Sequence, residues 1–166
     1  MVRRGGTLID DHGTSSHTDG HSACTGRDVT EHTETGRDLA RRVWIVEDEP
    51  AAATLAAELC DGWGAQVSVF RAPLPFLSAL RDRPQPTAVV LDWRLERELS
   101  AGLFLATRHR YPRLPVIYWT GHAAGELPSM ITDDALTTVV DKADGTGPFE
   151  RALDWASRFG ADEPAP

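Results

Sequence analysis

The chain has 166 residues, and its 25 acidic side chains outnumber its 17 lysines and arginines, giving a formal net charge of -8. This length is enough for one domain with its own core, and the negative charge argues against binding to the phosphate backbone of nucleic acids. No apolar run approaches the ~20 residues that span a bilayer, so we expect no membrane segment. The two isolated cysteines, Cys24 and Cys60, do not form a disulfide framework, and we therefore expect a cytoplasmic protein.

Residues 1–40 differ from the rest of the chain, because they contain no aromatic residue and are rich in Gly, Thr, Ser, His and Asp. Such a composition buries too little apolar surface to offset the entropy of ordering, so we interpret this segment as a disordered polar tail. The spacing of its histidines and Cys24 matches no four-ligand metal site, which makes metal binding the weaker alternative. A second disordered tail is expected at 161–166, which leaves 41–160 as the folded domain.

Short apolar runs and amphipathic segments alternate through the predicted domain. Runs rich in β-branched residues predict buried strands at 43–46, 65–70, 88–91, 115–119 and 137–140. Apolar spacings and proline positions predict helices at 50–62, around 76–80, at 103–109, at 128–135 and at 148–159. Between the third strand and the third helix, 96–101 is expected to be a charged loop. The fourth helix is the weakest prediction, because Gly121, Gly125 and Pro128 lie around it.

The alternation of strands and helices determines the expected fold class. Units of strand, helix and strand favour a parallel sheet, and their right-handed crossovers place helices on both of its faces. We therefore predict an α/β fold, a doubly wound (βα)5 sandwich of flavodoxin-like type around a five-stranded parallel sheet.

Charged or hydroxyl side chains stand at the ends of four of the predicted strands. In chain order they are Glu47 and Asp48, then Asp92, then Thr120, then Lys142. Ligands of open parallel sheets bind at the carboxyl edge of the strands, so we expect these side chains to converge there. The expected site holds three carboxylates, one hydroxyl and one ammonium group.

This set of groups suits phosphoryl chemistry on an aspartate. The carboxylate of Asp92 is a candidate nucleophile that would form an aspartyl phosphate. A divalent cation would screen its repulsion from the phosphoryl donor, and Mg2+ suits carboxylate ligands such as Glu47 and Asp48. Lys142 would stabilise charge on the transferring oxygens, and the hydroxyl of Thr120 would bond the phosphoryl group.

Four segments of the chain resemble the receiver domain of two-component response regulators. They are VWIVEDEP, VVLDWRL, VIYWTGH and VVDKAD, and they occur in the order of that family and at similar spacing. The resemblance covers about residues 42–160. It implies the flavodoxin-like receiver fold, phosphorylation by a protein partner, and Mg2+ as the cofactor.

The resemblance also implies a role for each matching residue. Asp48 would bind Mg2+ directly, Glu47 would bind it mainly through water, and the backbone carbonyl of Arg94 would complete the metal site. Asp92 would be the phosphoacceptor and a further metal ligand. Thr120 would be the switch hydroxyl, and Lys142 would be the phosphoryl partner.

The chain departs from the family pattern at several positions. Ala143 follows the lysine where the family usually has proline, and Val139 stands where an aromatic side chain usually responds to phosphorylation. Glu96 occupies a position that is usually proline, and the stretch from there to Gly102 is longer than usual. We therefore expect a site that accepts phosphate but signals by a modified route.

Two residues flanking the expected site are candidates for setting the lifetime of the phosphoryl group. Arg94 lies two residues after Asp92, and His122 lies two residues after Thr120. In this fold both side chains would border the phosphoryl group and control the access of water. We expect their substitution to change the rate of dephosphorylation more than stability.

The residues and the resemblance together predict a stand-alone, single-domain response regulator. It would take its phosphoryl group from a sensor histidine kinase or phosphotransfer protein and act on a downstream protein, with no nucleic-acid or membrane partner. It would catalyse only its own phosphorylation and dephosphorylation, and is not expected to be an enzyme otherwise. The alternative is a receiver-like scaffold that binds a partner without phosphorylation.

Two alternatives from other classes are less consistent with the sequence. A small phosphotransferase or hydrolase using Asp92 is disfavoured, because no second acid stands two residues later, where some aspartate-based phosphatases have one. A flavodoxin-like cofactor binder is disfavoured because the acidic strand ends would repel a flavin phosphate. Each strand-end residue also has an ordinary structural interpretation, with the acids as helix caps and Lys142 as a solvated surface lysine.

Overall fold

The computed structural model describes residues 41–95 and 98–159. The tails expected at 1–40 and 161–166, together with the metal-tract alternative, lie outside the described residues. In the described part of the chain, no helix is both long enough and apolar enough to cross a membrane.

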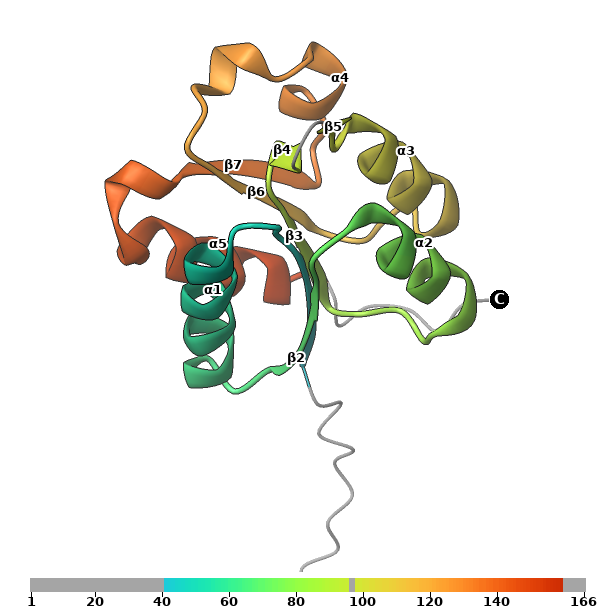
Figure 1. The fold of residues 1–166 in the computed structure, drawn as a ribbon, viewed down its shortest axis with the longest axis horizontal. Coiled ribbons are helices and arrows are strands. Elements are labelled where there is room, and N and C mark those ends of the chain that lie inside the picture. The colour runs from blue at the N-terminus through green and yellow to red at the C-terminus, as the bar shows by residue number, and fades with distance from the viewer. Residues whose placement is uncertain (1–40, 96–97, 160–166) are drawn as a thin grey trace, which may run out of the picture. The chain divides into compact units, whose positions relative to one another are not determined.

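Five parallel strands form the central sheet, as the sequence predicts (Figure 1). In chain order they are β1 (Arg42–Val46), β2 (Gln66–Phe70), β3 (Ala88–Leu91), β6 (Val116–Thr120) and β7 (Thr137–Asp141). Their order across the sheet is β2-β1-β3-β6-β7, so the chain moves one way from β1 to β2 and the other way from β3 onward. The carboxyl ends of β1 and β3 therefore flank the point where the strand order reverses, which is where doubly wound sheets bind ligands. The predicted fold class is confirmed.

Helices cover both faces of the sheet (Figure 1). One face carries α1 (Pro50–Gly62) and α5 (Thr146–Ser157), and the other carries α2 (Pro73–Asp82), α3 (Ala101–Arg110) and α4 (Ser129–Thr132). Successive residues of a strand face opposite sides, so Val43 and Ile45 pack in the core of the first face and Trp44 and Val46 in that of the second. All four are buried, which explains why the strand is apolar along its whole length.

Local signals in the sequence set the start and end of α1. Pro50 occupies the first turn, where its missing N–H costs nothing. The carboxylate of Glu49 accepts hydrogen bonds from the backbone N–H groups of Ala51 and Ala52, at 3.1 and 2.7 Å. After the helix, Gly64 adopts a φ of 82°, a left-handed conformation that favours glycine. The cap leaves only a short turn between β1 and α1, and this turn carries Glu47 and Asp48.

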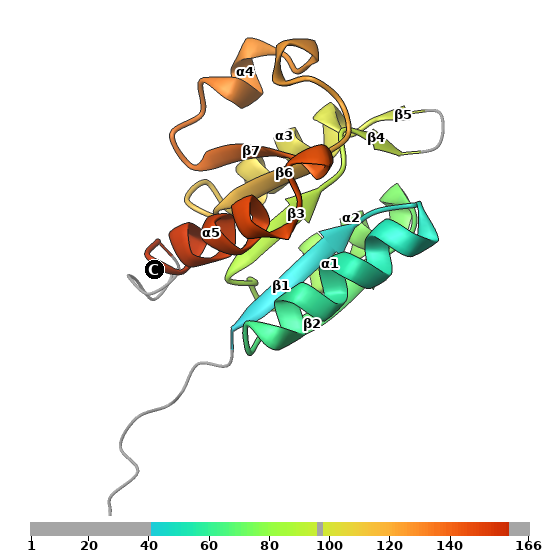
Figure 2. The same cartoon turned by 90° about the vertical axis from the view of Figure 1, so that its left-hand side faces the viewer.

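The segment after Asp92 contains a small second sheet that the sequence did not reveal. Strands β4 (Arg94–Leu95) and β5 (Glu98–Leu99) pair antiparallel, and Figure 2 shows them extending past the end of the five-stranded sheet. The prediction of a charged loop over 96–101 is therefore wrong for its described part, which continues from β5 into α3. The N–H of Ser100 donates to the carbonyl of Trp93 at 3.0 Å and closes the base of this hairpin. Leu95 is buried there, so packing and this closure determine the structure.

The region between β6 and β7 contains less helix than predicted. A 3-10 turn, η1 (Ala124–Glu126), precedes α4, and α4 is shorter than the helix expected at 128–135. The helix ends early because the carboxylate of Asp134 accepts a hydrogen bond from the N–H of Leu136 at 3.0 Å, which turns the chain toward β7. Another 3-10 turn, η2 (Lys142–Asp144), follows β7 and places Lys142 at the carboxyl edge of the sheet.

Candidate functional site

Three acidic residues meet where β1 and β3 end. Glu47 and Asp48 follow β1, Asp92 follows β3, and the two parallel strands finish side by side with Val46 opposite Leu91. Glu47 is 2% exposed and Asp92 is 8% exposed, so both carboxylates are largely removed from water. One carboxylate oxygen from each of the three acids lies within 4.8 Å of the other two. The structure thus places these three predicted site residues together.

The electrostatics of this acidic cluster are set by burial and by one lysine. Burial raises the pKa of the Glu47 carboxyl, the hydrogen bond from Lys142 opposes this rise, and the negative charge of Asp92 adds to it. Negative charges held this close repel one another, and a cation beside them offsets this repulsion. The cluster therefore favours the binding of positive charge at this edge of the sheet.

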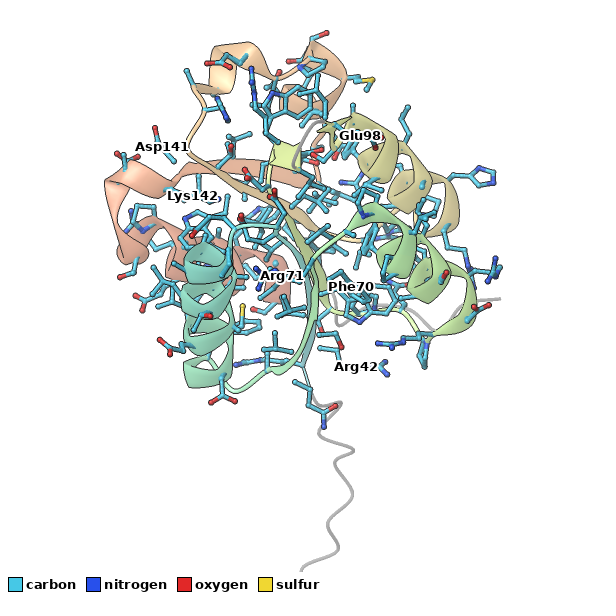
Figure 3. The ribbon with its side chains drawn as sticks, in the orientation of Figure 1. Arg42, Phe70, Arg71, Glu98, Asp141 and Lys142 are labelled. Carbon is cyan, nitrogen blue, oxygen red and sulfur yellow. The ribbon has the colours of Figure 1, made fainter. Side chains whose placement is uncertain are left out.

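Lys142 follows β7, the edge strand of the sheet, and its ammonium group lies beside the acids. Its Nζ lies 2.7 Å from Oε2 of Glu47 and 3.4 Å from Oδ2 of Asp92. Figure 3 shows Lys142 beside Asp141 at the end of β7. Its Nζ also lies 5.5 Å from the centre of the Trp119 ring, within the range of a cation–π contact. The lysine therefore bridges two of the acids, and its closer partner is Glu47.

The two oxygens of the Asp92 carboxylate have different neighbours. Oδ1 accepts a hydrogen bond from the backbone N–H of Trp93 at 2.7 Å, whereas Oδ2 lies nearer the ammonium group of Lys142. A short hydrogen bond to a charged carboxylate fixes the orientation of the group. Oδ1 is therefore bonded to the backbone, and Oδ2 faces the ammonium group of Lys142.

Thr120 is the last residue of β6 and is fully buried. It lies opposite Asp141 of the adjacent strand, one residue before Lys142. The described contacts give its hydroxyl one partner, the N–H of His122, which donates to Oγ1 at 3.3 Å. Thr120 stands at the correct edge of the sheet, but its hydroxyl bonds neither Asp92 nor Lys142 in the described part of the chain. Its role as a switch hydroxyl stays a prediction.

Comparison with solved structures gives many close matches in fold, although no family model and no curated protein matches the sequence. A response regulator receiver protein from Sinorhizobium medicae has a TM-score of 0.65 and 17% identity, covering 73% of this chain and 97% of that one. A chemotaxis response regulator of Vibrio cholerae has a TM-score of 0.62 and 13% identity, covering 70% and 98%. The signal receiver domain of a Bacteroides fragilis response regulator has a TM-score of 0.61 and 22% identity, covering 71% and 97%. The chain has the receiver-domain fold.

The receiver fold alone does not establish the chemistry, because one fold supports many functions. What this chain can do depends on its own residues at the carboxyl edge of the sheet. Three acids are clustered there, and Lys142 lies within ion-pair distance of two of them, Glu47 and Asp92. Arg94, by contrast, lies on β4 with an exposed side chain, and its backbone-carbonyl role at a metal stays a prediction.

The position where receiver domains usually carry an aromatic residue on the last strand is Val139, and the structure shows what surrounds it. Val139 lies directly opposite Tyr118 in the pairing of β6 with β7. Both side chains contribute to the core beneath α2, α3 and α4, and Tyr118 is fully buried. In this chain Val139 therefore has a large ring, that of Tyr118, on the neighbouring strand β6.

The two flanking residues occupy different environments in the receiver fold. Arg94 is exposed on the hairpin, and His122 lies in the loop after β6, where its Nδ1 is 3.3 Å from Oε2 of Glu126. The predicted influence of both residues on phosphoryl lifetime stays a prediction.

Three residues near Asp92 have contacts that sequence reasoning missed. They are Trp93, Ser100 and Tyr118, none of which was predicted from the sequence to be a site residue. Ser100 is 1% exposed, and its hydroxyl lies 3.5 Å from the hydroxyl of Tyr118, although it stands in a charged stretch. Tyr118 is the one hydroxyl-bearing side chain inside the apolar run 115–119, and that was the only available signal.

Proposed function

We propose that this chain is a response regulator receiver domain that accepts a phosphoryl group on Asp92 and acts as a phosphorylation-dependent protein–protein switch. The observation that carries the proposal is the position of Lys142 Nζ, 3.4 Å from Asp92 Oδ2 at the edge where three carboxylates meet. A nucleophilic carboxylate beside an ammonium group is what phosphoryl transfer to aspartate needs. The receiver fold of the matching structures supports this function.

The transfer we propose starts from a phosphohistidine on a sensor histidine kinase or phosphotransfer protein. Oδ2 of Asp92 attacks the phosphorus atom, and the P–N bond breaks as the new P–O bond forms. The imidazole nitrogen keeps the electron pair of the broken bond and takes up a proton. Lys142 balances the charge of the phosphoryl oxygens, and the hydroxyl of Thr120 donates a hydrogen bond to one of them.

Mg2+ is the proposed cofactor, because the donor atoms at this edge fit it. The three clustered acids offer hard oxygen ligands, and the set contains no histidine or cysteine. Glu47, Asp48 and Asp92 would hold the ion, with the carbonyl of Arg94 as a further predicted ligand. When bound, Mg2+ offsets the repulsion between the carboxylates and the incoming phosphoryl group.

The proposed reaction assigns the chain a place between two proteins. It takes a phosphoryl group from an upstream kinase or phosphotransfer protein and presents a changed surface to a downstream protein, in the cytoplasm. It catalyses only its own phosphorylation and dephosphorylation and has no other substrate. The alternative scaffold, which binds a partner without phosphorylation, is supported by the closer approach of Lys142 to Glu47 than to Asp92.

Intact-protein mass after incubation with acetyl phosphate tests the proposal directly. We expect a Mg2+-dependent gain of one phosphoryl group in the wild-type chain and none in Asp92→Asn. The substitution keeps the size of the side chain but removes the nucleophilic carboxylate.

The matched control is Asp133→Asn, because Asp133 is an exposed acid at the end of α4 outside the site. This variant is expected to gain the phosphoryl group as the wild type does. No mass gain in a wild-type chain that melts cooperatively would exclude phosphorylation by this route and favour the scaffold.

A further inference from the structure

Two backbone hydrogen bonds connect the Asp92 carboxylate to the base of the β4–β5 hairpin. The N–H of Trp93 donates to Oδ1 of Asp92 at 2.7 Å, and the carbonyl of Trp93 accepts from the N–H of Ser100 at 3.0 Å. Trp93 and Ser100 immediately flank the paired residues of the hairpin, Arg94 with Leu99 and Leu95 with Glu98. A change in the bonding of Oδ1 therefore acts on the residue that closes the hairpin.

Buried side chains tie the same two residues to the central sheet. The ring of Trp93 packs edge-on against that of Tyr118, with 6.2 Å between their centroids. The Ser100 hydroxyl lies 3.5 Å from the Tyr118 hydroxyl and donates toward it. Trp93 is 3% exposed, Ser100 is 1% exposed and Tyr118 is fully buried. Packing this dense transmits small shifts of one residue to its neighbours.

The proposed phosphorylation weakens the first of these bonds for a chemical reason. Transfer onto Oδ2, the oxygen nearer Lys142, leaves Oδ1 as the carbonyl oxygen of an acyl phosphate. The N–H of Trp93 then donates to a neutral carbonyl instead of a charged carboxylate. A hydrogen bond to a charged acceptor is roughly twice as strong as a neutral one, so the bond weakens when Asp92 is modified.

The segment before β7 is held by bonds that do not involve Asp92. Arg108 of α3 pairs with Asp134 at 2.7 Å and also donates to the carbonyl of Leu136 and the hydroxyl of Thr137. These bonds fix the stretch between α4 and β7, and none of them involves a residue of the acidic cluster. Apart from its ion pair with Lys142, the described side-chain contact of Asp92 therefore leads through Trp93 to the hairpin rather than to α4.

We propose that Trp93, Ser100 and Tyr118 form a relay that reports the phosphorylation state of Asp92 to the β4–β5 hairpin, which makes the hairpin the surface that changes between the two states. This inference rests on the function proposed above. It assigns Trp93, Ser100 and Tyr118 as positioning residues that act through the Asp92 carboxylate and its backbone link.

Backbone amide hydrogen exchange of the full chain tests the relay, with Mg2+ present throughout and acetyl phosphate either added or left out. Intact mass measured on the same samples gives the phosphorylated fraction. We expect exchange in peptides covering Trp93–Ser100 to become about fivefold faster on phosphorylation, in line with the loss of part of one hydrogen bond. Peptides covering the stretch from η1 to α4 are expected to change less.

Tyr118→Leu and Phe104→Leu separate the relay from general loosening of the core. Both variants lose an aromatic ring from the same core. The side chains of Trp93 and Ser100 contact the Tyr118 side chain, whereas Phe104 meets Ser100 only through the backbone, where its N–H donates to the Ser100 carbonyl and is kept in the variant. We expect Tyr118→Leu to lose most of the phosphorylation-dependent change around the hairpin, and Phe104→Leu to keep it. Should Tyr118→Leu fail to fold, Trp93→Phe, which retains the backbone link but changes the packing ring, serves in its place.

The outcomes distinguish the relay from the function on which it rests. Absence of a mass gain in the wild type contradicts the proposed function. A mass gain accompanied by faster exchange between η1 and α4, and by unchanged exchange around the hairpin, overturns the relay and leaves the proposed function intact. Equal effects of the two leucine variants also overturn it.

Discussion

The two carboxylate oxygens of Asp92 have different partners: one accepts a backbone hydrogen bond and the other lies near an ammonium group. Trp93 donates to Oδ1 at 2.7 Å, and Lys142 stands 3.4 Å from Oδ2. The hydrogen bond prevents free rotation of the carboxylate, so Oδ2 stays directed toward the ammonium group. In the proposed transfer, a carboxylate that is oriented before the phosphoryl donor arrives would lose less entropy on reaching the transition state.

Arg94 and His122 are the residues at which the lifetime of the phosphoryl group is expected to be set. We predict that Arg94→Ala/His122→Ala speeds loss of the phosphoryl group by about tenfold, because both side chains are expected to limit the approach of water, and tenfold equals about 1.4 kcal/mol of barrier. The free energy of unfolding is expected to change by only about 0.5 kcal/mol, since neither side chain is buried. Decay of the phosphorylated mass with time measures the effect.

The control for this double variant is Arg151→Ala on α5, which removes an exposed arginine from another part of the surface. It is expected to leave the decay rate unchanged. An unaltered decay rate in the double variant would show that other groups exclude water from the site.

Among the elements, the short α4 is followed by a segment that a side chain of α3 holds in place. The Arg108 guanidinium of α3 reaches the carboxylate of Asp134 and the chain that leads into β7. Burial acts to raise the pKa of the Asp134 carboxyl, but the hydrogen bonds from Arg108 and Thr137 outweigh it and hold that pKa below its usual value. A carboxyl whose pKa is lowered by folding stabilises the fold in its charged form.

Asp134→Asn is therefore expected to destabilise the chain by about 1.5–3 kcal/mol near neutral pH, the contribution typical of hydrogen bonds to a charged group. The contribution of Asp134 is fully present above its unfolded pKa, close to 3.8, and is lost as the pH falls through the lower folded pKa. The difference between wild type and variant should thus shrink on acidification. Urea unfolding measured at several pH values gives this dependence.

Asp133→Asn is the control here as well, because its carboxyl is exposed next to Asp134 in the chain. We expect its free energy of unfolding near neutral pH to stay close to that of the wild type. A gap between wild type and Asp134→Asn that stays constant with pH would contradict the assigned role of the charge.

The sequence predicted the elements whose structure follows from local pattern. Buried strands such as 88–91 are continuous apolar runs, and the helix at 50–62 has its proline and its apolar stripe in the sequence. The candidate site residues stand at the carboxyl ends of these strands, so the location of the site could be predicted from the same pattern.

The hairpin after Asp92 could not be predicted, because strands as short as β4 and β5 have no usable periodicity. Its structure depends on the closure of Ser100 onto Trp93 and on the burial of Leu95, which are tertiary contacts. The contact between Lys142 and Glu47 is likewise tertiary, since it joins the first and last strands of the chain.

For the molecule as a whole, we expect the acidic cluster to make stability depend on cations. We predict that Mg2+ raises the melting temperature, because it relieves the repulsion among Glu47, Asp48 and Asp92 and binds only the folded state. At about 100 times its dissociation constant, Mg2+ would add about 2.7 kcal/mol. Thermal unfolding with Mg2+ and with a chelator measures this.

Asp48→Asn removes one ligand charge and is expected to lose most of the Mg2+ effect, whereas Asp133→Asn is expected to keep it. Equal stabilisation of both variants by Mg2+ would place the ion elsewhere.

The division of the site between early and late strands has a consequence for synthesis. The three acids are complete once β3 has emerged from the ribosome, whereas Lys142 follows only after β7. A nascent chain that stops after β3 would hold three adjacent carboxylates without the lysine that neutralises them. We therefore expect the first half of the sheet to become stable only after β7 has been made and Lys142 can reach the acids.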